Sequence, residues 1–339
     1  MVSPIDRALI GGWRATGLAA LTSDVSALDG GGRWVVVLPF EGPPVCARFR
    51  DWSPVEGPTG AAADRRVPVP LASWRSSLDR GAFAKGVQRV REAIAAGDVY
   101  QVNLCRRLSA PLPEGFDVWA FGTALLDAHP APHGAVVDLP SAGVHVASAS
   151  PERFLCRTGR KVESRPIKGT APSARGLTAK DRAENVMIVD LVRNDLGRVC
   201  EYGSVEVPGL WEVEPHPGLV HLVSTVSGRL RPGKGWADLV AATFPPGSVT
   251  GAPKLAALEV IAALEPVARS VYTGAVGWVD ADRGEADLNV AIRTFWVEDG
   301  ELHLGVGGGI TWDSTPDGEW EETELKARRL LAVAAAAAA

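Results

Sequence analysis

The hydrophobic pattern changes from helical to strand spacing at Gly97, so any fold for this chain must join a helix directly to a strand. Asp79 to Ala96 is predicted to be an amphipathic helix because its apolar residues recur at three- and four-residue steps. These residues are Phe83, Val87, Val90 and Ile94. Gly97 stands where a glycine usually ends a helix. Asp98 to Cys105 then alternates and is rich in β-forming residues, which predicts a strand.

Two polar residues mark one face of that strand. Val99, Gln101 and Asn103 stand at alternate positions and therefore share a face. Polar residues there fit a solvated surface and the wall of a pocket equally well.

The rest of the chain mixes short strands and helices. Strands are predicted at Arg33 to Leu38, Val45 to Phe49, Val144 to Ser150, Tyr272 to Val279 and Leu288 to Val297. Helices are predicted from Lys180 to about Leu196 with Thr178 as N-cap, from Leu255 to Leu264, and after Thr315-Pro316. Asp51 to Pro70, rich in Gly, Pro and Ala, is predicted to be a loop or linker, and Leu330 to Ala339 the frayed end of a helix.

Composition narrows the class of protein. With 339 residues, 46% hydrophobic and 22% charged, the chain is long enough and apolar enough to bury a substantial core. A net charge of -5 without a basic stripe argues against a nucleic-acid partner. The four cysteines are far apart and form no CxxC pair, which fits a reducing compartment. No signal-peptide core or membrane span is visible, so a cytoplasmic protein without a membrane partner is expected.

One lysine stands out in the segment Glu163-Ser-Arg-Pro-Ile-Lys-Gly-Thr170. The chain has seven lysines and 28 arginines, so a lysine between a rigid proline and a free glycine suggests a need for an amine. Lys168 would lose its proton on desolvation or beside another cation, for which Arg165 is the candidate, and a neutral amine is a nucleophile. The alternative is a solvated lysine on a surface turn.

Paired carboxylates occur on two predicted helices. Asp181 and Glu184 are three residues apart, and the same spacing recurs at Glu319 and Glu322. Acidic residues in a first turn often only cap the helix. Two such pairs would also converge on one hard cation through oxygen ligands, which is the chemistry that Mg²⁺ accepts.

Three further segments are candidates for a site. Glu152 follows a proline at a strand end, where it would either project into a cleft or pair with Arg153. Thr250 would cap the helix after it, whose free N–H groups suit an anion. Gly305 to Gly309 follows a predicted strand and would let backbone approach a ligand closely.

Together these stretches resemble the chorismate-utilising enzymes. The resemblance covers about residues 80 to 332 and rests on Lys180 to Arg198, Phe244 to Lys254, and Gly307 to Ile310 followed by Glu322-Thr323 and Lys326. It implies an α+β fold like that of anthranilate synthase component I, with antiparallel sheets packed face to face and helices outside. Residues 1–78 would be a short, weakly matching N-terminal region, 79–332 the chorismate-binding catalytic domain and 333–339 an alanine-rich tail.

The resemblance also implies roles for individual residues. Glu184 and Glu322 would ligate Mg²⁺, supported by Asp181 and Glu319, and Glu152 would be the acid beside the C4 hydroxyl of chorismate. The substrate would be bound by Arg293, Lys326, Tyr272, Thr250, His221, Gln101 and the backbone of Gly307, Gly308 and Gly309.

Two positions distinguish the branches of the family. Gln101 stands where branches that add water to chorismate carry a lysine base, and glutamine cannot take a proton at neutral pH. Pro-Ile-Lys-Gly-Thr, with Lys168, resembles the aminodeoxychorismate synthase branch rather than the anthranilate synthase branch. The expected activity is that of component I of the former, converting chorismate and ammonia to 4-amino-4-deoxychorismate on the way to 4-aminobenzoate and folate. Ammonia would come from a glutamine amidotransferase subunit. The alternatives are anthranilate synthase component I and a catalytically silent chorismate-binding partner.

Overall fold

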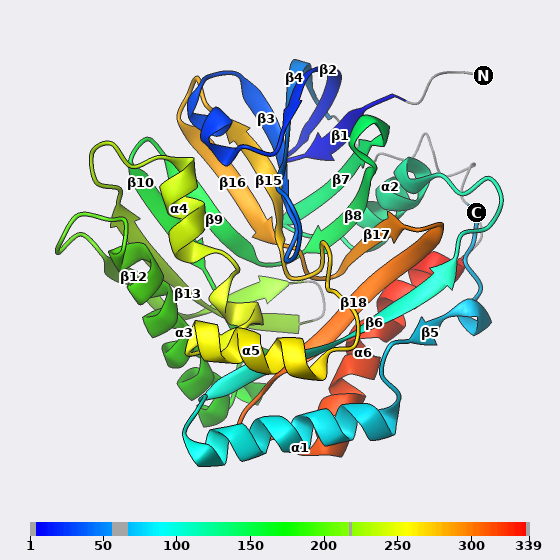
Figure 1. The fold of residues 1–339 in the computed structure, drawn as a ribbon, viewed down its shortest axis with the longest axis vertical. Helices are drawn as coiled ribbons and strands as arrows, with labels where there is room; N and C mark the ends of the chain where they lie inside the picture. Colours follow the sequence, from blue (N-terminus) through cyan, green and yellow to red (C-terminus); the bar gives the residue numbers. More distant parts are fainter. Residues whose placement is uncertain (1–4, 56–66, 217–218, 337–339) are drawn as a thin grey trace.

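The computed structural model describes residues 5–55, 67–216 and 219–336, in which six α-helices surround a strongly curled β-sheet (Figure 1). The helices are α1 (Arg80–Ala96), α2 (Val118–Ala128), α3 (Ala179–Gly197), α4 (Trp236–Thr243), α5 (Lys254–Leu264) and α6 (Pro316–Ala335). The strands are β1 (Arg7–Ile10), β2 (Trp13–Thr22), β3 (Arg33–Leu38), β4 (Val45–Pro54), β5 (Arg75–Ser76), β6 (Gln101–Pro111), β7 (His133–Leu139), β8 (Val144–Ser150), β9 (Arg153–Thr158), β10 (Lys161–Arg165), β11 (Ile167–Ala171), β12 (Glu206–His216), β13 (Leu219–Arg229), β14 (Gly251–Ala252), β15 (Ala275–Asp280), β16 (Glu285–Val290), β17 (Thr294–Glu298) and β18 (Glu301–Ile310).

The strands form one path in which neighbours are antiparallel. In spatial order the path is β5, β6, β18, β17, β8, β7, β1, β2, β4, β3, β15, β16, β9, β10, β13, with β11 and β12 on β13 and β14 on β6. Strands from residues 1–78 therefore pair with later ones, as β3 does with β15. The domain boundary at residue 78 stays a prediction. Hydrogen bonds of one sheet cross it.

The path curls where two long strands break at the same point. β8 continues into β9 through Pro151 and Glu152, and β16 continues into β17 through residues 291–293. β8 pairs with β17, whereas β9 pairs with β16. The backbones are tied at the break, since Val290 N donates to Glu152 O at 2.9 Å and Ala149 N donates to Arg293 O at 3.0 Å. Glu152 and Arg293 are thus fixed at the point where the sheet turns over.

The alternation of β3 shows how apolar residues fill the space on both faces of the sheet. Val35 and Val37 enter the core between the sheet layers, with Cys105, Tyr272 and Trp296 from distant segments. The residues that alternate with these two valines belong to a second core under α3 and α4: Trp34, Val36 and Leu38. Since successive side chains of a strand point to opposite faces, both faces of β3 are buried. The predicted α+β fold, with antiparallel sheets face to face and helices outside, is confirmed.

Several predicted elements have the bounds that the sequence indicated. Arg33–Leu38 and Val144–Ser150 are strands with those limits, and α1 is capped by Asp79 and ends at Gly97, which has φ 84°. Thr178 caps α3, as predicted. The last helix runs from Pro316 to Ala335, and residues 337–339 of the predicted tail lie outside the described residues, as do 56–66 of the predicted loop.

Other predictions need correction. Thr250 does not cap α5, because its Oγ1 donates to the carbonyls of Pro246 and Gly247 at 3.0 and 3.3 Å, and Pro253 is the N-cap residue. The predicted strand from Tyr272 begins only at Ala275, and the one from Leu288 breaks before Thr294. Gly305 to Gly309 lies inside β18 instead of after a strand.

Candidate functional site

Three strands bring Lys168, Gln101 and Gly309 together. Gln101 begins β6, and Gly309 near the end of the adjacent β18 pairs with Asn103. Lys168 lies on β11. A Cβ atom added to Gly309 would lie 2.7 Å from Gln101 Nε2 and 3.2 Å from Lys168 Nζ. The glycine therefore keeps open the small space that the amine and the amide share.

The environment of Lys168 favours the neutral amine more than ordinary solvent does. Burial lowers its pKa, and the charge of Lys326 adds to that effect. Glu184, Glu152 and Glu322 act in the opposite direction but leave the net pKa lowered. The prediction that Arg165 is the cation beside Lys168 is wrong, because its guanidinium hydrogen-bonds Glu214 and the neighbouring cation is Lys326.

Glu152 is a buried acid whose carboxyl interacts by charge with Lys168. Burial raises its pKa, opposed by a hydrogen bond with Ser248, the charge of Lys168 and the backbone N–H of Ile167. The alternative pairing with Arg153 is not present, because that guanidinium binds Asp287 through two bonds of 3.0 Å. A carboxyl with a raised pKa beside an amine suits proton donation.

All four predicted metal-binding carboxylates are linked by charge, since the charge of Asp181, like that of Glu322, raises the pKa of Glu184. Glu184 on α3 and Glu322 on α6 interact, because the charge of Glu322 raises the pKa of Glu184, after burial as the largest cause. Burial also raises the pKa of Glu319, with Glu322 adding to it, and Ser314 Oγ donates to Glu319 Oε1 at 2.5 Å. Asp181 accepts bonds of 2.7 Å from the N and Oγ1 of Thr178, so its carboxylate caps α3.

These carboxylates match the donor chemistry of Mg²⁺. The described residues contain no group of three or more acidic, His or Cys side chains already arranged around a point. Glu322 Oε1 instead contacts Lys326 Nζ at 2.6 Å, and Glu184 Oε1 contacts Lys180 Nζ at 3.7 Å. Oxygen donors from two helices that repel one another fit a hard divalent cation, which would relieve the repulsion. Glu184, Glu319 and Glu322 are the residues that would hold it.

The glycines of β18 connect the lysine with the carboxylates. A Cβ added to Gly308 would lie 2.9 Å from Glu319 Oε2, and Lys326 Nζ donates to Gly307 O at 2.9 Å. Gly308 thus lies against the α6 acids while Gly309 lies against Lys168. Larger residues would fill the space between the strand and these groups.

Gln101 is an unpaired amide at the centre of this arrangement. Its side chain is fully buried, and neither amide atom has a hydrogen-bond partner among the described residues. An unsatisfied buried amide is costly, so its persistence beside Lys168 indicates a site for a polar ligand.

Gly309→Ala is expected to lower kcat by about tenfold to a hundredfold, because the new methyl displaces Gln101 and Lys168. Gly197→Ala is the control, since its Cβ would meet no atom of the described residues within 4 Å beyond its chain neighbours and its own helix backbone. Steady-state kinetics and thermal unfolding of both variants check this. Wild-type kcat for Gly309→Ala would mean that the space beside Gly309 is not part of the site.

The other predicted residues lie at different distances from this centre. His221 pairs with Thr170 on β11, two residues from Lys168, and its Nδ1 lies 2.8 Å from Thr170 Oγ1. Arg293 is exposed at the sheet break, and the charged residue that acts on it is another cation, Arg329. An exposed arginine with that neighbour suits an anionic ligand.

Within the part of the chain that the structure describes, Tyr272 and Thr250 make their hydrogen bonds away from Lys168. The ring of Tyr272 packs where a side chain at Gly305 would be, and its hydroxyl hydrogen-bonds Cys105. Thr250 is fully buried and turned toward its own 3-10 turn. Their contact with a substrate stays a prediction.

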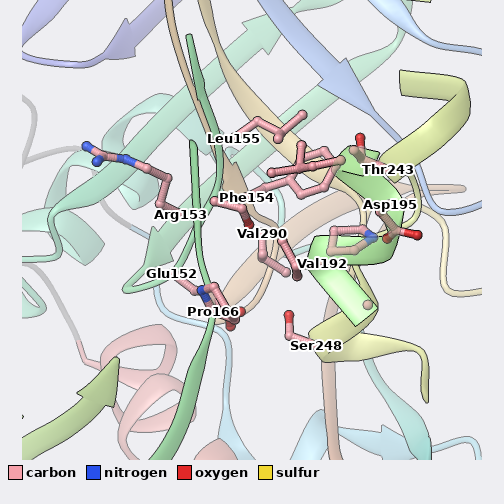
Figure 2. Close-up of a pocket in the computed structure, with 14 residues that line it drawn as sticks. Glu152, Arg153, Phe154, Leu155, Pro166, Val192, Asp195, Thr243, Ser248 and Val290 are labelled. Carbon is pink, nitrogen blue, oxygen red and sulfur yellow. The ribbon is translucent and has the colours of Figure 1, made fainter. Parts of the chain in front are cut away.

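A pocket behind Glu152 contains residues that sequence reasoning missed. Figure 2 shows Ser248 and Glu152 lining it, with Asp195 and Thr243 on the helical side. Lys254 closes that side through a 2.7 Å bond to Asp195 Oδ2 and a 2.9 Å bond to Thr243 O. The sequence could have indicated Ser248, because it lies in the segment from Phe244 to Lys254 that also contains Thr250.

The structure is similar to solved members of one fold class. It matches anthranilate synthase component I from Streptococcus pneumoniae with a TM-score of 0.75 and 26% identity, covering 89% of this chain and 80% of that one. It matches a putative 2,3-dihydroxybenzoate-specific isochorismate synthase of Bacillus anthracis with a TM-score of 0.81 and 23% identity, covering 97% and 96%. The fold class is therefore that of anthranilate synthase component I.

Sequence comparison gives the family. Residues 50–332 match the model of the chorismate binding enzymes, and the chain belongs to that family. It is 44% identical over 297 residues to anthranilate synthase component 1 of Streptomyces coelicolor, covering 79% of this chain and 57% of that protein. It is 41% identical over 286 residues to aminodeoxychorismate synthase component 1 of Salmonella typhimurium, covering 80% and 62%. The chain thus spans less than two thirds of either relative.

Among the described residues, no helix is both long and apolar enough to cross a bilayer.

Proposed function

We propose that this chain acts as component I of an aminodeoxychorismate synthase, converting chorismate and ammonia to 4-amino-4-deoxychorismate. The observation that carries the proposal is the half-buried Lys168, whose amine has a lowered pKa and interacts by charge with the buried acid Glu152. A solvated lysine would provide only charge, whereas a neutral amine provides a nucleophile.

In this mechanism the amine of Lys168 attacks C2 of the ring as the C4 hydroxyl leaves as water. Glu152 gives the departing hydroxyl a proton, and its raised pKa keeps that proton available. Ammonia then enters at C4 and expels the lysine, which returns to the free amine. Two displacements thus place the nitrogen at C4.

Binding of the substrate's two carboxylates would use opposite ends of the site. Mg²⁺ held by Glu184, Glu319 and Glu322 would supply the positive charge for the ring carboxylate. Arg293 and Lys326 would bind the enolpyruvyl carboxylate with the β18 backbone. Water activation is disfavoured, because the neutral amide of Gln101 is not a base.

Anthranilate synthase component I is the second candidate, since a relative with that name is equally similar. It would aminate C2 directly and would not need a nucleophilic lysine. Lys168 therefore favours the first candidate. Ammonia is expected from a separate glutamine amidotransferase subunit.

Chromatography and mass spectrometry of products from chorismate, ammonium and Mg²⁺ test the proposal. The purified chain is expected to make 4-amino-4-deoxychorismate with ammonium and almost none with glutamine. Without ammonia, little isochorismate or salicylate should form. Anthranilate as the main product would favour the second candidate, and no turnover of chorismate would refute both.

A further inference from the structure

Arg269 is a buried arginine whose five N–H donors are all used. Its Nε and Nη2 form a fork on Glu265, at 2.8 and 2.6 Å. Nη1 donates to Val249 O at 2.9 Å and Thr273 Oγ1 at 3.2 Å, and Nη2 donates to Asn103 O at 2.7 Å. The side chain is 2% exposed, and its guanidinium lies over the ring of Phe40. Five donors is the full capacity of an arginine.

Three of these acceptors belong to segments that build the candidate site. Val249 follows Ser248, the hydrogen-bond partner of Glu152. Asn103 is two residues beyond Gln101 on β6. The guanidinium of Arg269 therefore links the segment of Ser248, which hydrogen-bonds Glu152, to strand β6, which carries Gln101.

The third acceptor belongs to Thr273, whose backbone has a conformation that threonine seldom adopts. Thr273 has φ 62°, in the left-handed region that β-branched residues avoid. Such a conformation persists only where surrounding bonds impose it. Thr273 N donates to Ala291 O at 2.9 Å, beside the sheet break, while Arg269 holds the hydroxyl. The network thus extends from α5 to the break that positions Arg293.

We propose that Arg269 is a positioning residue of this site, which holds Ser248 on Glu152 through the carbonyl of Val249 and fixes the Gln101 end of β6 through the carbonyl of Asn103. This rests on the proposed function in that Glu152 is the acid. Lysine cannot replace Arg269, because an ammonium offers three donors without a planar fork.

The consequence is a change in the acidity of Glu152. The groups that act on its carboxyl are Ser248, Lys168 and the N–H of Ile167. The other charged residues of the pocket are paired, Arg153 with Asp287 and Asp195 with Lys254. Because the Ser248 bond lowers the pKa of Glu152, a displaced Ser248 raises that pKa. A general acid then stays protonated to higher pH, and the basic limb of the rate profile moves upward.

The test compares Arg269→Lys with Arg160→Lys, a control whose guanidinium binds Leu230 O and Glu201 away from these residues. Arg269→Lys is expected to lower kcat on the order of tenfold to a hundredfold with little change in KM, and to shift the basic limb upward. The control should do neither. A lower kcat with an unshifted limb, matched by a loss of folded protein, would make Arg269 merely structural and overturn the proposal.

A second readout does not depend on turnover. An NMR titration of ¹³C-labelled glutamate carboxyls, with Glu152 assigned by Glu152→Gln, should show the same upward shift in Arg269→Lys. If that variant does not fold, Glu265→Gln loosens the fork and should shift Glu152 in the same direction. An unshifted Glu152 in the folded variant refutes the positioning role, even if wild-type protein fails to convert chorismate and the proposed function is wrong.

Discussion

Replacing Lys168 with alanine is expected to lower the formation of 4-amino-4-deoxychorismate by at least roughly 10³-fold, since removing the nucleophile of a serine protease lowers kcat by about 10⁶-fold. Burial and the charge of Lys326 lower the pKa of the Lys168 amine, and alanine offers no amine that could attack the ring. Chorismate binding, measured by calorimetry, should change little, because the carboxylates of the substrate are held elsewhere. Some direct amination at C2 is the expected residual reaction.

Lys161→Ala is the matched control for this experiment. Lys161 lies on the preceding strand β10, exposed, with Glu163 as its partner at 3.5 Å. It should retain wild-type kcat. A near wild-type rate for Lys168→Ala would leave the lysine only an electrostatic contact and would remove the main argument against anthranilate formation.

Glu322→Gln and Glu184→Gln are expected to lower kcat/KM by at least about a hundredfold at a fixed Mg²⁺ concentration. Each change keeps the shape of the side chain but removes the charge through which Glu184 on α3 and Glu322 on α6 interact. The Mg²⁺ concentration for half-maximal rate should rise, and calorimetry should show weaker Mg²⁺ binding without substrate.

Glu321→Gln is the control for the acidic pair, since Glu321 lies on the same helix but contacts Arg80 at 3.1 Å. Its Mg²⁺ dependence should be that of wild type. If Glu322→Gln keeps wild-type activity and Mg²⁺ affinity, the acids of α6 are charge partners of Lys326 and not metal ligands.

Local signals explain what the sequence predicted well. The capping box of Thr178 and Asp181 is contained in four residues, and Gly97 ends α1 by its own backbone freedom. The same capping box shows why the paired-carboxylate pattern was ambiguous at Asp181, because a cap and a ligand use the same oxygens. The fold class depended on family resemblance, since the pairing of β3 with β15 joins residues about 240 apart.

Nonlocal contacts explain what the sequence did not predict. The stretch from Leu288 to Val297 was predicted to be one strand, but β9 and β8 pair with its two halves separately, and this imposes the break at residues 291–293. Lys168 and Arg165 are close in sequence, but the strand directs Arg165 to Glu214 and α6 supplies Lys326. Arg269 matched no motif, because the two bonds that link it to the site go to backbone carbonyls of distant segments, Val249 and Asn103, which carry no side-chain signal.

The most direct measurement is the intact mass of the protein after incubation with chorismate and Mg²⁺ in the absence of ammonia. The account predicts an adduct on wild type with the mass of chorismate less one water, located by peptide mapping at Lys168. Ammonium should discharge it to 4-amino-4-deoxychorismate, and Lys168→Ala should not form it. Wild-type protein that turns over chorismate and ammonia without ever carrying this adduct, even in rapid-quench samples, would contradict the covalent mechanism.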